Sequence, residues 1–204
     1  MTNGAGRNCP SGVETDETKS YMGFLTKLID KVEEFIGHSP HPAIVAVPIG
    51  AWITATVADG LAIGTKNPKY DEAARISVAV GLVGAAGAAI TGLHDYHYIP
   101  KDREPSRSIA TRHGLGNVVA TSLFLMSYIL RTKASRANKK PSTLARGLSF
   151  AGTGLVTYTG WLGGKLVEEQ GEAVKPIIQQ QNEAKKTRKR MAVAGPMPAV
   201  SLLN

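Results

Sequence analysis

The sequence predicts an all-α integral membrane protein: an up-down bundle of four membrane-spanning helices preceded by an amphipathic helix. Three observations predict this class. Four windows, each close to the roughly twenty residues that a hydrocarbon core requires, carry almost no charged side chains. The connectors between these windows are short and polar, which favours antiparallel neighbours. The charged residues, 20% of the chain, gather in the tails and connectors, so the average composition conceals the apolar windows.

The composition also excludes several classes of protein. The 204-residue chain has one cysteine, Cys9, which excludes an internal disulfide and a cysteine cluster for zinc or iron–sulfur. Lysine and arginine outnumber acidic residues by 24 to 16, and anionic membrane headgroups explain this excess more simply than nucleic acid does. The sequence has no P-loop, no metalloprotease helix motif and no nucleophile elbow, so it does not predict an enzyme or a nucleic-acid partner.

The N-terminal region divides into two parts. Residues 1–19 are polar, and we expect them to be disordered and not to be a removable signal peptide. Residues 20–37 repeat apolar side chains at three- and four-residue steps, which predicts an amphipathic helix. This helix is too polar to span a bilayer, so it lies in the membrane interface or packs on a partner, and we favour the interface. The apolar positions are Tyr21, Phe24, Leu25, Leu28, Ile29, Val32, Phe35 and Ile36.

The four apolar windows make up a predicted transmembrane domain at residues 41–164. Because they hold almost no ionised side chains, core helices of a soluble protein are the weaker explanation. The second window is rich in glycine and alanine, and small side chains let lipid-embedded helices approach closely. The remaining tail, 165–204, is polar, with a basic cluster at 185–190 that suits solvent or lipid headgroups. The windows are about Ala43–Gly64, Ile76–Leu93, Ile109–Leu130 and Gly147–Gly164.

Residues equidistant from the midpoint of an antiparallel turn lie at the same membrane depth. By this rule all the histidines fall at one side, which we call the histidine side, together with Asp95. Asp59 lies near the opposite interface, level with Ile76. Because a charge in lipid is costly unless it is paired or hydrated, we predict a structural ion pair between Asp59 and Arg75, with a proton or ion site at Asp59 as the alternative. The histidines are His38, His41, His94, His97 and His113.

The histidine side offers candidate ligands for a cofactor. His41, His94 and His113 reach one depth from three helices, and nearby glycines leave space for a ring or an ion. A haem b would use these histidines, whereas a transition metal would use His41 and His113 with Asp95. The alternative is a cofactor-free layer in which the imidazoles cap helix ends or pair with Asp95 in the polar interface.

A series of short motifs lies at the predicted helix ends. The motifs are His41–Gly50, Asp59, Gly92–Tyr96, Arg112 and His113 with Asn117, and Thr159–Val167. In this order they resemble a bacterial membrane-protein family known as domain of unknown function twenty-two thirty-one, over about residues 41–175. The resemblance implies a bacterial inner membrane protein. It also favours a function in electron transfer, since some family members look associated with Rieske-type or cytochrome-like redox partners. We map His41 and His113 onto the family pattern, but not His94 or His97.

Basic residues are unevenly distributed between the two ends of the predicted bundle. The connectors Thr65–Arg75 and Arg131–Arg146 are richer in lysine and arginine than His94–Ser108, which favours an external histidine side. The two tails share that side, and their basic residues oppose this orientation.

Three functions remain open at this point. The first is an integral membrane accessory protein that binds haem b or a transition metal and exchanges electrons with a protein partner. The alternative is a cofactor-free structural subunit of a larger respiratory or photosynthetic membrane complex. A proton or ion path through Asp59 is disfavoured, because one carboxylate near one interface does not make a route across the bilayer.

Overall fold

The computed structural model describes residues 16–172, 183 and 186–190. Between residues 16 and 168 the chain forms α-helices and no strands, which confirms the all-α class for this part of the protein. Residues 1–15 of the predicted polar N-terminus and most of the predicted tail after residue 172 lie outside the described residues. The helices are α1 (Asp16–Ile36), α2 (His41–Thr65), α3 (Pro68–Tyr98), α4 (Ser106–Arg136) and α5 (Thr143–Glu168).

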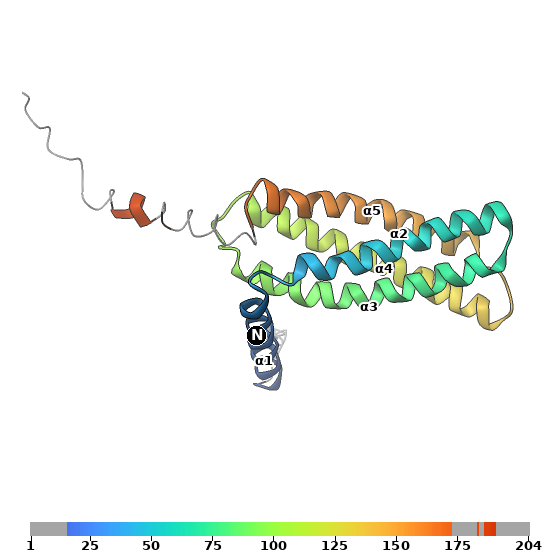
Figure 1. Ribbon diagram of the computed structural model, residues 1–204, viewed down its shortest axis with the longest axis horizontal. Helices are drawn as coiled ribbons and strands as arrows, with labels where there is room; N and C mark the ends of the chain where they lie inside the picture. The colour runs from blue at the N-terminus through green and yellow to red at the C-terminus, as the bar shows by residue number, and fades with distance from the viewer. Residues whose placement is uncertain (1–15, 173–182, 184–185, 191–204) are drawn as a thin grey trace, which may run out of the picture.

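Helices α2 to α5 lie side by side with alternating direction, and α1 projects steeply away from one end of the bundle, beside the end of α3 (Figure 1). Helix α2 packs against α3 and α5, and α4 packs against the same two helices. Consequently α2 and α4 face each other across the diagonal of the bundle. Only long side chains can meet across this diagonal.

The helices extend beyond the predicted apolar windows. The Asn67 side chain accepts a hydrogen bond from the Lys69 backbone N–H at 3.0 Å and caps α3, and Ser142 caps α5 in the same way through Ala145. Pro68, at the first position of α3, starts a helix without losing an intrahelical hydrogen bond. Most of the residues expected in the connectors Thr65–Arg75 and Arg131–Arg146 are therefore helical.

The core of the bundle is built on one aromatic pair across the diagonal. Trp52 of α2 stacks on Phe124 of α4, with ring centroids 4.1 Å apart and planes 9° apart. Each ring lies against a glycine of a neighbouring helix, Gly81 for Trp52 and Gly152 for Phe124. A Cβ at Gly152 would lie 2.7 Å from the phenyl ring, so these glycines are required by the size of the aromatic side chains.

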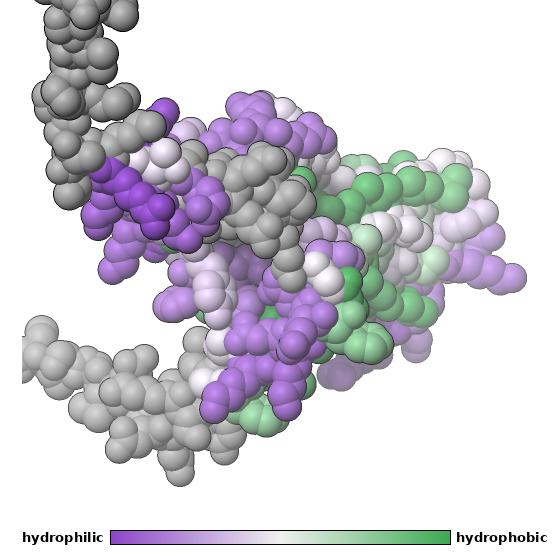
Figure 2. All heavy atoms as spheres, turned by 60° about the vertical axis from the view of Figure 1, so that its left-hand side comes forward, coloured by the Kyte–Doolittle hydropathy of each residue, from purple (hydrophilic) through white to green (hydrophobic). Residues whose placement is uncertain are grey.

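The outer surface of the bundle is apolar. Val57, Val83 and Val118 are 58%, 77% and 64% exposed, and Figure 2 shows hydrophobic side chains over the bundle between hydrophilic ends. Helices α2, α3 and α4 are each long and apolar enough to cross a membrane. Helix α5 is not among them, because serine, threonine and glycine replace much of its aliphatic surface.

Helix α1 leaves an apolar face uncovered. It begins at Asp16, ahead of the predicted start, and its Phe24, Leu28 and Phe35 side chains are 64%, 48% and 91% exposed. Its contact with the bundle is polar: the Asp30 carboxylate lies 3.0 Å from His94 Nε2 and accepts a hydrogen bond from the Tyr98 hydroxyl at 3.4 Å.

Candidate functional site

The histidine side contains a close pair of imidazoles. His41 is the first residue of α2, and His113 lies in the second turn of α4. Their ring centroids are 6.4 Å apart, and the planes are nearly perpendicular at 85°. A Cβ at Gly92 would lie 2.7 Å from His41 Cε1, and one at Gly163 would lie 3.1 Å from His113 Cε1. The two glycines therefore leave room for the Cε1 edge of each ring against a neighbouring helix, and the rings approach each other across the diagonal.

Each ring is oriented by a hydrogen bond at Nδ1. The Thr91 hydroxyl donates its hydrogen to a backbone carbonyl one turn earlier in α3, so it accepts from His41 Nδ1 at 3.1 Å. The backbone carbonyl of Thr159 accepts from His113 Nδ1 at 2.8 Å. In the neutral form both rings thus carry the proton on Nδ1 and have their lone pair on Nε2. The Asn117 side-chain amide lies 3.2 Å from His113 Nε2 and can donate to it.

His94 and Asp95 belong to a different set of contacts. The buried His94 ring packs on Tyr98 with centroids 4.9 Å apart, and its Nε2 faces Asp30 of α1. The Asp95 carboxylate accepts a hydrogen bond from the Ser39 hydroxyl at 2.7 Å and lies 3.5 Å from His94 Nδ1. These contacts hold α1 and the start of α2 on the end of α3.

The predicted ligand sets are therefore only partly assembled. In the described part of the chain, no group of three or more His, Cys, Asp or Glu side chains is placed to hold a metal ion. His41 and His113 come together, whereas His94 turns toward α1 and Asp95 toward Ser39. His97 is exposed against Tyr98, and His38 contacts the neighbouring Ser39 carbonyl.

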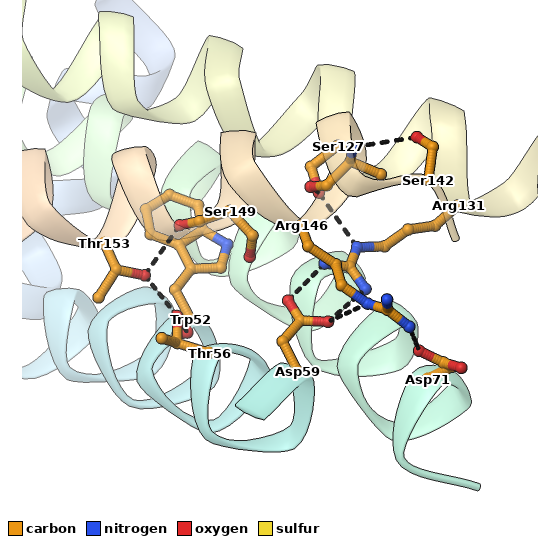
Figure 3. Close-up of polar contacts among 11 residues, drawn as sticks. Trp52, Thr56, Asp59, Asp71, Ser127, Arg131, Ser142, Arg146, Ser149 and Thr153 are labelled. Atoms are coloured by element: carbon orange, nitrogen blue, oxygen red, sulfur yellow. Dashed lines mark hydrogen bonds and ion pairs between the residues drawn. The ribbon is translucent and has the colours of Figure 1, made fainter. Parts of the chain in front are cut away.

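The opposite end of the bundle holds a buried ion pair. The Arg131 guanidinium binds the Asp59 carboxylate through two parallel hydrogen bonds of 2.9 and 2.5 Å, and both side chains are fully buried (Figure 3). This corrects the predicted pair of Asp59 with Arg75, because Arg75 instead binds Glu72 on its own helix, at 2.9 and 2.5 Å. Asp59 faces the bundle centre, where the long Arg131 side chain reaches it across the diagonal.

Two more charged residues complete this cluster. Arg146 binds Asp71 at 2.6 Å, and its Nε lies 3.9 Å from Asp59 Oδ1. Figure 3 shows Arg146 between the two carboxylates. Each bundle helix thus contributes one residue, and two acids balance two guanidiniums. This cluster therefore links all four bundle helices at one depth, and removing one member of a buried pair would leave its partner's charge uncompensated.

The role of Arg131 was missed although the sequence contains a signal for it. Arg131 follows the last apolar residue of the third window, and the depth rule applied to the connector between the second and third windows sets it level with Ile76. Asp59 is level with Ile76 as well. Arg75 lies on the helix adjacent to Asp59, whereas Arg131 lies at equal depth on the diagonal helix and is long enough to reach the same carboxylate.

Long apolar helices, an apolar outer surface and polar ends define an α-helical membrane protein. The sequence model of the family described as "Predicted membrane protein (DUF2231)" matches residues 37–176, and the chain belongs to this family. The match agrees with the resemblance noted in the sequence and includes all four bundle helices. No curated protein and no solved structure matches the chain.

Proposed function

We propose that this protein is a four-span membrane protein that binds a haem through His41 and His113 and serves as an electron-transfer component of a bacterial inner membrane. The observation that carries this proposal is the pair of imidazoles, brought together from two helices and each oriented through Nδ1. Helix α5 is the fourth span, since it packs along two helices that are apolar enough to cross the bilayer.

The number of ligands favours haem over a bare transition metal. A zinc or similar ion generally needs three or four protein ligands, whereas two candidate ligands meet here among the residues that the structure describes. A haem iron receives four nitrogens from its porphyrin and needs one or two axial side chains from the protein. Two imidazoles are therefore a sufficient donor set for haem.

The arrangement of the two rings also fits this role. Histidines that bind a metal usually donate their other ring N–H to a protein acceptor, as His41 and His113 do. The two rings come from different helices and lie close together, with centroids 6.4 Å apart, so His41 and His113 are the residues that would hold a haem. When bound, the haem would supply one-electron chemistry, and the chain's residues would bind it and fix the imidazole orientations.

An absorption spectrum of the full chain, purified in mild detergent from cells with ample iron and haem, tests the proposal. We expect a Soret band that shifts on reduction with dithionite and is lost in His41→Ala and in His113→Ala. His97→Ala is the matched control and retains the band, because His97 lies outside the pair. Colourless wild-type protein contradicts the proposal.

A cofactor-free structural subunit of a larger membrane complex is the second candidate. The Asn117 amide, 3.2 Å from His113 Nε2, favours it because this contact satisfies the imidazole without a cofactor. This alternative expects a colourless protein that co-purifies with the same complex in wild type, His41→Ala and His113→Ala.

The proposal includes the orientation of the bundle in the membrane and the location of α1. The basic end, with the connectors α2–α3 and α4–α5, faces the cytoplasm, and the histidine side faces outward. Helix α1 projects from the bundle end at a steep angle to the bundle axis and exposes apolar side chains, as an interfacial helix would.

A further inference from the structure

A cavity opens at the basic end of the bundle, away from the histidine side. Its volume is about 350 Å³, within the range of small-ligand sites. It lies between the start of α3 and the end of α4 with the connector that follows. Its charged lining consists of four basic residues and two acidic ones: Arg75, Arg131, Lys139, Lys140, Asp71 and Glu72.

The arginines and acids of this lining are already paired. Arg131 binds Asp59, Arg75 binds Glu72, and Arg146 binds Asp71. These three pairs cancel, and the charges left over are the ammonium groups of Lys139 and Lys140. Both lysines are exposed, and neither forms a salt bridge with an acid in the described part of the chain. The cavity therefore has two uncompensated positive charges.

The two positive charges would attract an anion, and the membrane depth of the cavity indicates what kind of anion is available there. Arg75 directly precedes the apolar residues of α3, and Arg131 directly follows those of α4. The cavity thus lies at the boundary between hydrocarbon and water, which is the level of the phospholipid phosphates. Basic pockets between membrane helices at this level bind anionic headgroups, most often at the cytoplasmic leaflet.

We propose that this cavity binds the phosphate group of an anionic phospholipid headgroup, with Lys139 and Lys140 as its charge partners. The Arg75–Glu72 and Arg131–Asp59 pairs form the fixed wall against which the headgroup lies. The group that the lysines would bind is a phosphate anion. Because the cavity lies at the boundary of the membrane, the phosphate of a lipid headgroup is favoured over a free phosphate ion.

Titration of the full chain in neutral detergent with phosphatidylglycerol or phosphatidylcholine tests this assignment, with the thermal unfolding midpoint as readout. We expect phosphatidylglycerol to raise the midpoint and phosphatidylcholine to have no comparable effect. In Lys139→Gln/Lys140→Gln the apparent affinity for phosphatidylglycerol should fall roughly thirtyfold, since each of the two basic side chains near an anionic surface contributes on the order of 1 kcal/mol.

The matched control is Lys69→Gln/Lys133→Gln, which removes two charges from the same end of the bundle but outside the cavity lining. It should bind phosphatidylglycerol like the wild type. An equal loss in both double variants would overturn the site, because it would reflect the general charge of this end. Inorganic phosphate at matched ionic strength should leave the midpoint unchanged, and stabilisation equal to that by phosphatidylglycerol would overturn the lipid source.

Discussion

Asp59 and Arg131 are fully buried and form a two-point ion pair that joins the diagonal helices α2 and α4. Removing one partner leaves an uncompensated charge in a low-dielectric layer. We therefore expect Asp59→Asn or Arg131→Gln to lower the free energy of unfolding by roughly 3–5 kcal/mol. Thermal and denaturant unfolding in detergent measure this loss.

The control for this pair is Arg75→Gln, which breaks the more exposed Arg75–Glu72 pair within α3. Such a pair contributes about 1 kcal/mol or less. The double variant Asp59→Leu/Arg131→Leu should lose less than the two single variants together, because no lone charge remains buried. Equal effects of Arg75→Gln and Arg131→Gln would show that the buried pair is not the stabilising one.

Gly152 should tolerate no side chain, although it lies on a helix. A methyl group there would overlap the Phe124 ring, so we expect Gly152→Ala to cost roughly 1–3 kcal/mol of unfolding free energy. Gly154, one half-turn further along α5, has no atom within 4 Å of an added Cβ. Gly154→Ala should be neutral or stabilising by about 0.5–1 kcal/mol, since alanine is the better helix former. The reverse order would contradict the packing around Phe124.

Thr91 should affect haem affinity at the proposed site indirectly, through its hydrogen bond with His41. Thr91→Val removes the acceptor at His41 Nδ1, and loss of such a support typically weakens binding by about 10–100-fold. Haem retention during dilution, followed at the Soret band, measures the change. Thr54→Val is the matched control, because the exposed Thr54 hydroxyl donates to the Gly50 carbonyl of its own helix and lies outside the histidine pair. Identical haem retention in the two variants would exclude a supporting role for Thr91.

Helix α1 should detach locally when its polar contact is lost. The Asp30 carboxylate joins α1 to the buried His94 ring, so we expect Asp30→Asn to increase hydrogen exchange in residues 23–36 by roughly fivefold, the effect of one hydrogen bond. The unfolding midpoint of the bundle should stay unchanged. Glu34→Gln is the control on the same helix. Unchanged exchange in Asp30→Asn would mean that other contacts hold α1.

The four-span topology can be checked by cysteine labelling in intact membranes, after Cys9→Ser removes the native thiol. Lys69→Cys and Ser135→Cys should label from one side, because they lie at the basic end. Lys101→Cys and Glu169→Cys should label from the other. Labelling of positions 135 and 169 from the same side would mean that α5 does not cross the bilayer.

The sequence by itself determined the membrane class, the family, the helix order and the common depth of the histidines. The membrane class, the helix order and the depths follow from hydropathy and chain length, since an apolar helix of sufficient length can span a membrane. The family follows from the resemblance of the short motifs at the helix ends. The sequence also placed His41 level with His113, and Asp59 near the other interface.

Only the tertiary structure decided which residues at one depth touch each other. Depth is a coordinate along the bundle axis, whereas contact also depends on the rotation of each helix and on side-chain length. Those factors paired Asp59 with Arg131 and turned Arg75 toward Glu72. They brought His41 to His113 and directed His94 to Asp30 instead, because Gly92 and Gly163 allow close approach at the first two rings and α1 covers the third.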